Sequence, residues 1–341
     1  MLYLIAHVQV SFGENYEKKL SSVVRVSVND SIDGIGARCE ITCPLNARIE
    51  KDGGTPFIAP VRTAFKAGDK VRVKAWYDDY PERTLFEGYV YQIREGTPST
   101  IVCEDQVYLL RRGILNNVWN KPVKLKEILR YVCSSQGVEV SDDVADVEFI
   151  KFSIKDSSPL YVLQQIKSEM WLVVTFRDKK LVATGISATK GNNVKLASDR
   201  NVIGCNIQQP DGVWKQFKLK VEYTDKNGKK KSFTVGDQEG QIRVVDCTSV
   251  TKENAESFVN THVLDNLRTG MYEGTLTTLL YPEVKLFSLV DYKDKSFSSL
   301  NGTYKVKRVG VTIDTQGCRQ TLTLAQIASD MPVPQTTLSN G

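Results

Sequence analysis

Residues 65–112 read FKAGDKVRVKAWYDDYPERTLFEGYVYQIREGTPSTIVCEDQVYLLRR, and this stretch decides the fold. Gly68 and Asp69 form a turn, after which apolar and basic residues alternate over residues 70–77. Alternation with a period of two is typical of a half-buried strand. The sequence therefore predicts a strand whose inward face carries Val71, Val73, Ala75 and Tyr77.

The remainder of the stretch predicts two more strands. The Asp-Asp-Tyr-Pro sequence at 78–81 ends the first strand. Residues 85–94 form a second run, in which Gly88 marks a bend or a bulge. A Gly-Thr-Pro turn at 96–98 leads into a third run at 100–104. Three short strands joined by tight turns form a meander, the unit of small barrels and sandwiches.

The order of motifs in this stretch resembles the late control D family of phage tail proteins. The carrying motifs are Gly-Asp-x-Val-x-Val at 68–73, Leu-Phe-Glu-Gly-Tyr-Val at 85–90, and Cys-Glu-Asp followed by Tyr-Leu-Leu-Arg-Arg at 103–112. These proteins are baseplate hubs of contractile tails, and the hub half of type VI secretion spike proteins is similar to them. The closing run at 301–326, NGTYKVKRVGVTIDTQGCRQTLTLAQ, also resembles the family, so the resemblance covers most of residues 1–328.

Composition sets the broad class. A chain of 341 residues exceeds what one hydrophobic core usually serves, so two or three domains are expected. A net charge of +5 is too weakly basic to indicate a nucleic-acid binder. There is no run of 18 apolar residues, so no membrane span is expected. The seven cysteines are odd in number and irregularly spaced, which indicates free thiols made in a reducing cytoplasm.

The pattern along the chain predicts a mainly β fold with an α+β insert. We expect a first barrel-like tube domain at 1–115, an α+β middle domain at 116–199, a second barrel-like tube domain with one helix at 200–328, and a flexible tail at 329–341. Within the middle domain, apolar spacing predicts a helix that buries Leu125, Ile128, Leu129 and Val132. A second helix begins at Ser158 and Pro159, and buries Leu163, Ile166 and Met170.

The second tube domain is expected to repeat the first. Residues 88–93 match residues 302–307 in shape, and each segment is followed by a turn and a strand. This predicts that both copies carry their meander strands in the same order and direction. Residues 286–291 lack the Gly-Asp that opens the first copy, so the extent of the second barrel stays open.

The residues that could carry chemistry do not form a recognisable catalytic or metal site. His7 and His262 are far apart in sequence, and Cys39 and Cys43 have no second ligand pair at zinc spacing. The acidic pairs Asp78-Asp79 and Asp142-Asp143 lie in turn-like sequence, and Glu104-Asp105 is interpreted as a turn or cap. We therefore expect no catalytic, cofactor-binding or metal-binding residues.

Two further features allow a functional interpretation beside an ordinary one. Lys229, Lys230 and Lys231 follow an Asn-Gly turn, where a solvated hairpin tip is favoured over a phosphate-binding patch. Trp76 and Trp119 could anchor an interface, although core packing is the default for tryptophan.

The sequence therefore predicts a structural protein. The resemblance implies a homotrimer whose duplicated tube domains form a ring that adapts a six-fold tail tube to a three-fold spike. It also implies contacts with the tail tube protein, the central spike protein and other baseplate proteins, non-specific passage of DNA through the channel, and a location in a virion baseplate or injection particle. The alternative is a β-rich carbohydrate-binding or hydrolytic module, which would need clustered aromatic residues or opposed carboxylates.

Overall fold

The computed structural model describes residues 4–186, 188–189, 191–207, 217–225, 228–236, 240–264, 267 and 274–326. The chain is mostly β with a few small helices, which confirms the predicted fold class. The tail expected at 329–341 lies outside the described residues, as do Lys226 and Asn227 of the predicted hairpin turn.

One long sheet organises the molecule. Its main path runs β18-β22-β25-β24-β3-β4-β9-β8-β7-β1-β2-β5-β6, and β17 and β23 extend it beside β24. We call the N-terminal part the first β unit. It contains β1 (Ala6–Phe12), β2 (Lys18–Leu20), β3 (Arg25–Ser31), β4 (Arg38–Cys43), β5 (Asn46–Lys51), β6 (Phe57–Pro60), α1 (Val61–Ala64), β7 (Lys70–Tyr77), β8 (Arg83–Arg94) and β9 (Ser99–Glu104).

The predicted meander is formed by β7, β8 and β9, and the four side chains expected on the inward face of β7 are all buried. Gly88, however, does not itself form a bulge. The register of β8 shifts at Leu85 against β7 and at Tyr91 against β9. Gly88 instead permits close approach, because a Cβ atom there would lie 2.2 Å from the carbonyl oxygen of Glu104.

The C-terminal part of the long sheet, which we call the second β unit, has the same strand order. In chain order its strands are β17 (Asn193–Ala197), β18 (Val202–Ile207), β22 (Gly274–Thr278), β23 (Leu289–Lys293), β24 (Gly302–Asp314) and β25 (Gly317–Gln326), with η3 (Ser298–Leu300) between β23 and β24. The first unit pairs as β1-β7-β8-β9-β4-β3, and the second as β17-β23-β24-β25-β22-β18. One pairing differs, because β1 is antiparallel to β7 whereas β17 is parallel to β23.

Corresponding strands of the two units also share a β-bulge. In β8 the extra residue is Tyr91, opposite β9, and in β24 it is Lys307, opposite β25. The bulges align Val90 with Val306, so the structural match is displaced by two residues from the sequence match of 88–93 with 302–307. A bulge bends its strand and strengthens the local twist, so both meanders curve at the same place.

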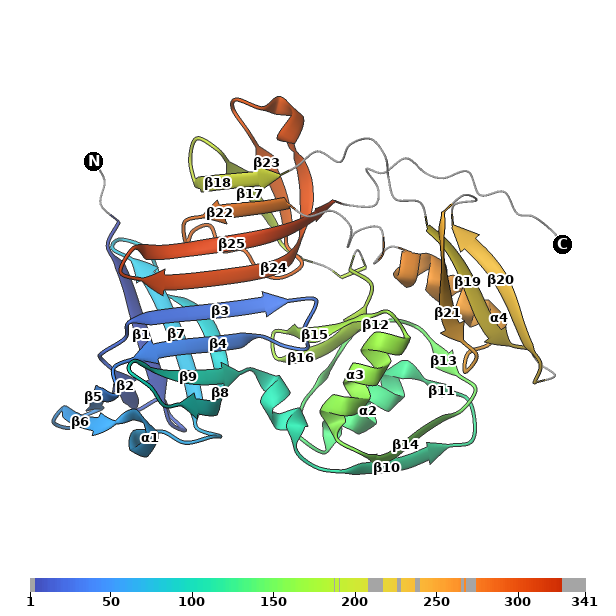
Figure 1. Cartoon of the computed structure of the whole chain (residues 1–341), viewed down its shortest axis with the longest axis horizontal. Helices are drawn as coiled ribbons and strands as arrows, with labels where there is room; N and C mark the ends of the chain where they lie inside the picture. The colour runs from blue at the N-terminus through green and yellow to red at the C-terminus, as the bar shows by residue number, and fades with distance from the viewer. Residues whose placement is uncertain are drawn as a thin grey trace.

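Strand β24 joins the two units (Figure 1). Its first residues pair with β23, and residues 308–313 form six antiparallel pairs with residues 26–31 of β3. The buried apolar side chains of both units form one continuous core, which extends from Val10 and Phe12 to Leu322 and Leu324. Neither unit therefore has a separate hydrophobic interior.

The remaining elements form a middle unit with its own core. Its first segment comprises η1 (Gln106–Arg111), β10 (Leu115–Trp119), β11 (Val123–Lys124), α2 (Leu125–Ser134), β12 (Val140–Val144), β13 (Glu148–Phe149), β14 (Phe152–Ser157), α3 (Pro159–Glu169), β15 (Val173–Arg177) and β16 (Lys180–Thr184). The two predicted helices are confirmed, with the expected side chains buried and the Ser158 hydroxyl accepting from the Tyr161 amide at 3.3 Å.

The boundaries of the middle unit differ from those expected. Its second segment comprises β19 (Phe217–Thr224), β20 (Lys230–Gly236), β21 (Gln241–Cys247), α4 (Lys252–Phe258) and the π-helical turn η2 (Val259–Val263), which fall within the predicted second tube domain at 200–328. Leu219, Val221 and Phe258 belong to the core of the middle unit. The Ile150 amide also donates to the Ser249 carbonyl at 2.8 Å. Conversely, β17 belongs to the long sheet although it lies within 116–199.

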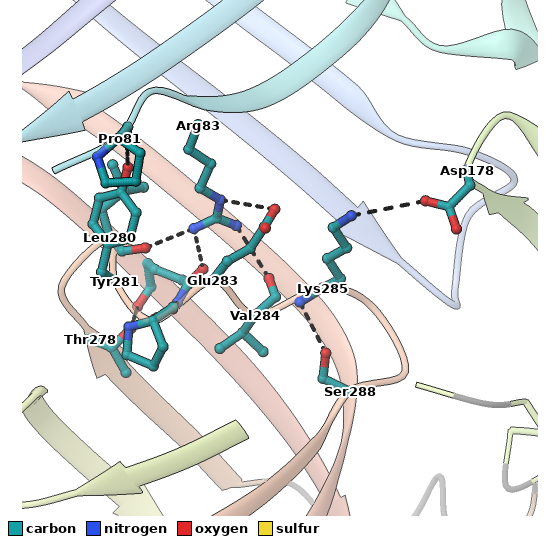
Figure 2. A network of polar contacts seen from close by, with 12 residues as sticks. Pro81, Arg83, Asp178, Thr278, Leu280, Tyr281, Glu283, Val284, Lys285 and Ser288 are labelled. Carbon is teal, nitrogen blue, oxygen red and sulfur yellow. Dashed lines mark hydrogen bonds and ion pairs between the residues drawn. The ribbon is translucent and has the colours of Figure 1, made fainter. Parts of the chain in front are cut away.

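A buried arginine fastens the second β unit to the first (Figure 2). Arg83 of β8 is 9% exposed, and its Nη1 donates to the Leu280 carbonyl at 2.8 Å and to Gln320 Oε1 at 3.0 Å. Its Nη2 donates to the Val284 carbonyl at 3.3 Å, and its Nε to Glu283 Oε1 at 3.3 Å. A buried guanidinium is stable only when its donors are paired, so β8 and residues 280–284 hold one another in place.

Tyr77 makes a second polar link close by. Its hydroxyl donates to the Cys318 carbonyl at 3.0 Å and accepts from the Leu280 amide at 3.3 Å. Tyr281 extends the contact, because its ring stacks on that of Tyr80 and its hydroxyl donates to the Pro81 carbonyl. The turn after β7 is therefore packed directly on the second β unit.

Replacing Gly88 with alanine should lower the free energy of unfolding by about 1–3 kcal/mol, because the new methyl group meets backbone atoms that cannot turn aside. Urea denaturation followed by circular dichroism measures the loss. Gly310→Ala on β24 is the matched control, since the nearest atom to its Cβ would be 3.8 Å away. Equal stability of the two variants would contradict the close approach.

Replacing Arg83 with methionine should cost about 3–5 kcal/mol, because the carbonyl and carboxylate oxygens that it serves lose their donor. The control is Arg62→Met, which removes an ion pair to Glu95 at 2.8 Å from a side chain that is 74% exposed. That change should stay within about 0.5 kcal/mol. If the denaturant midpoints fall equally in both variants, the buried contacts of Arg83 do not stabilise the fold more than an exposed ion pair does.

Candidate functional site

The two histidines lie in different units. His7 on β1 stacks on Trp76 with ring centroids 5.4 Å apart, and its Nε2 lies 2.5 Å from Asp78 Oδ1. His262 Nδ1 accepts from the Gly185 amide at 3.1 Å in the middle unit. The structure therefore does not bring the histidines together, and each contributes to local packing.

The acidic pairs take separate roles. Asp79 occupies a left-handed turn position with φ 65°. Asp142 and Asp143 lie on strand β12 rather than in the expected turn, where Asp142 pairs with Lys126 at 2.6 Å and Asp143 with Arg177. These carboxylates are therefore engaged in ion pairs along the surface of the middle unit.

Glu104 and Asp105 form the predicted cap. The Arg111 guanidinium donates to both Glu104 oxygens, at 2.6 and 2.7 Å. Asp105 caps η1 by accepting from the Val107 amide at 3.0 Å, and it also accepts from the Ala37 amide at 2.7 Å. The pair thus fixes the end of β9 to the start of the middle unit.

The seven cysteines are free, and all except Cys205 are buried. Cys39 lies opposite Cys103 in the β4–β9 pairing. Burial raises the pKa of Cys43 to about 11 and that of Cys133 to about 12, so these thiols stay protonated and unreactive at neutral pH. Within the described residues, no group of three or more His, Cys, Asp or Glu side chains is arranged to hold a metal ion.

The lysine run and Trp119 have the ordinary interpretation, whereas Trp76 is half-buried on the outward face of β7 and does not belong to the core. Lys230 and Lys231 are exposed on β20, and Lys231 pairs with Asp225 at 3.2 Å. Trp119 is half-buried at the margin of the middle core, with its ring 5.3 Å from that of Tyr131 in an edge-to-face contact. Among the described residues, the longest helices are too short and too polar to span a bilayer.

The two ends of the main path of the long sheet have free strand edges, and among the described residues β17, off this path, pairs only with β23. In the described residues β6 pairs only with β5 and β18 only with β22, so each has an unpaired edge. Both strands also expose apolar side chains, with Ile58 74% and Ile203 51% exposed and Phe57 half-exposed. An exposed apolar edge strand is a template for pairing with another chain.

Strands β6 and β18 carry ordinary strand patterns, which do not distinguish an edge strand from a central one. Pro60 in β6 is a local indication, since proline within a sheet is confined to edges and strand ends. Which strands stay unpaired depends on the pairing of all the others. The edges therefore became visible only in the folded chain.

No family model matches the sequence, and no curated protein matches it. Several solved structures are similar to the chain in fold. The 43 kDa tail protein of prophage MuSo2 from Shewanella oneidensis has a TM-score of 0.64 at 16% identity, covering 94% of this chain and 98% of that one. A tail protein from Neisseria meningitidis MC58 has a TM-score of 0.65 at 11% identity, covering 94% and 96%.

A component of the Escherichia coli type VI secretion system, described as similar in structure to bacteriophage T4 tail proteins, has a TM-score of 0.58 at 8% identity and covers 97% of this chain and 79% of its own. These likenesses run across nearly the whole chain, so they include both β units and the middle unit. The chain has the fold of phage tail proteins, and the predicted resemblance to baseplate hub proteins is confirmed at the level of the fold.

Proposed function

We propose that this protein is a structural baseplate hub of a phage tail or of a contractile injection system. The observation that carries the proposal is the shared strand order of the two β units, which agree in six strands and in the position of a bulge. We take these units as two copies of one tube domain. The middle unit is then an insertion made of two segments of chain.

Two similar domains in one chain suit a symmetry adaptor. Three chains arranged around a three-fold axis present six similar surfaces at pseudo-six-fold positions, because each chain contributes both copies. Such a ring can contact a six-fold tail tube on one side and a three-fold spike on the other. The shared core and the Arg83 contacts keep the two copies at a fixed spacing, which a rigid ring requires.

The free edges of the long sheet supply contacts between chains. The β6 edge lies at one end of the sheet and the β18 edge at the other, so head-to-tail association brings the β6 of one chain to the β18 of the next. Such heterologous contacts form a closed ring when the rotation between chains is one-third of a turn. Burial of Phe57, Ile58 and Ile203 supplies the apolar part of the contact.

In this function the tail tube protein, the central spike protein and other baseplate proteins are the partners, and DNA passes through the channel without sequence-specific contacts. The particle is assembled from chains made in the bacterial cytoplasm. The role is structural, since the side chains considered for catalysis are engaged in caps, ion pairs and packing.

The purified chain should form trimers. Light scattering coupled to size exclusion should approach three times the 38.2 kDa of one chain as the concentration rises. A mass that stays at one chain over the full concentration range would contradict the ring.

Lysine at Ile58 or Ile203 should block trimer formation without unfolding the chain, because a charge on an edge strand opposes pairing with another strand. Scattering mass reports the assembly, and circular dichroism reports the fold. The control is Ile242→Lys on β21, which is 65% exposed but lies outside the long sheet. Trimers that survive both edge substitutions, or that are lost with the control, would place the interface elsewhere.

A further inference from the structure

The two-residue turn between β15 and β16 connects the middle unit to both β units. Asp178 and Lys179 form this turn. Glu87 of the first β unit pairs with Lys179, and Lys285 of the second pairs with Asp178, as Figure 2 shows for the second pair. All four residues line a cleft of about 350 Å³. The turn therefore spans this cleft from one β unit to the other.

Both ion pairs of the turn are open to solvent. Lys179 Nζ lies 2.7 Å from Glu87 Oε2, and the Lys179 side chain is 64% exposed. Glu87 also accepts from Arg72 Nε, which keeps its carboxylate in position. Lys285 Nζ lies 3.9 Å from Asp178 Oδ1, and these side chains are 54% and 76% exposed. Dissolved salt can therefore screen both pairs.

The residues of the turn do not suit its backbone geometry equally well. The φ angles of Asp178 and Lys179 are 48° and 66°. Two-residue hairpin turns with positive φ at both positions favour Asn-Gly or Asp-Gly. Asp178 fits this preference, whereas Lys179 occupies the position where glycine is least strained. A strained residue persists where the surrounding structure holds it, and the ion pair with Glu87 is such a contact.

The apolar contact beneath the turn is small. Val173 on β15 and Ile186 after β16 pack with Leu286, Phe287 and Ala325 of the second β unit, in a cluster separate from the two large cores. A small interface between domains leaves relative motion as the expected behaviour. The two β units share one core, so the middle unit is the part that can move against the sheet.

A second attachment of the middle unit lies at the turn after β3. There Asp105 accepts from the Ala37 amide at 2.7 Å, and Lys167 donates to the Gly34 carbonyl at 2.7 Å. The chain also enters the middle unit here, since η1 follows Asp105 directly. This attachment is held by the backbone itself, whereas the β15–β16 turn is held through side chains.

We propose that the β15–β16 turn is an ionic strap, which holds the middle unit against both β units and releases it when salt screens the two ion pairs. The middle unit then turns about its attachment at residues 34–37, and the cleft opens. Exposed ion pairs contribute little free energy, so a change in salt concentration is enough to shift the balance. The strap lies within one chain and does not depend on the role as a hub.

A thiol placed under the strap tests the proposal. Leu286 is 6% exposed and packs with Val173, so Leu286→Cys reports when the middle unit lifts. The substitution is made together with Cys205→Ser, which removes the exposed native thiol. Mass spectrometry follows modification by N-ethylmaleimide, an uncharged reagent. Between low salt and about 1 M NaCl the rate should rise about two- to fivefold, the range that a surface ion pair supplies.

Variants of the turn separate release of the strap from general destabilisation. Lys179→Gly should be modified at the faster rate already at low salt, and its thermal midpoint should not fall, because glycine fits the left-handed position. Lys179→Arg keeps the charge and should keep the slow rate. Lys180→Gln is the matched control, because Lys180 pairs with Glu139 at 2.9 Å within the middle unit. It should also keep the slow rate.

If Leu286→Cys does not fold by circular dichroism, Ala325→Cys places the thiol in the same cluster. A rate that is the same at low and high salt would overturn the proposal. So would Lys179→Gly reacting as slowly as Lys179→Arg, or Lys180→Gln reacting as fast as Lys179→Gly.

Discussion

The pairing of β24 with β3 is the interaction on which the rest of the structure depends. It places two units side by side in one sheet, and it directs both inward faces into a common core. The buried guanidinium of Arg83 and the hydroxyl of Tyr77 reinforce this junction, because each spans from the first unit to the second. Spacing and orientation of the units are consequently fixed within a single chain.

The middle unit shows how an insertion can leave such a sheet intact. The chain leaves the long sheet after β9, adds β17 and β18 to it, and leaves it again before β22. The two segments outside the sheet pack their apolar side chains against one another, so they share one core. Lys167 of α3 ties this unit to the sheet by donating to the Ile32 and Gly34 carbonyls in the turn after β3.

Similarity to tail proteins persists at identities of 8–16% because the fold depends on pattern more than on particular residues. Alternation along the strands and bulges at fixed places are satisfied by many apolar sequences. In the proposed role as a hub, the chain acts through its surfaces and its symmetry. The features that this role needs are free strand edges and a rigid spacing between the two β units.

Local patterns in the sequence determined the elements themselves. The alternation at Val71–Tyr77, the helical spacing from Leu125 to Val132, and the caps at Ser158 and Asp105 each depend on neighbours within a few residues, and the structure has them as expected. Only the tertiary structure decided that β24 pairs with β3, that β19, β20, β21 and α4 join the middle unit, and that Arg83 is buried. These features join residues that are often more than 200 positions apart. The local pattern of apolar and polar residues in one strand does not specify which distant strand pairs with it.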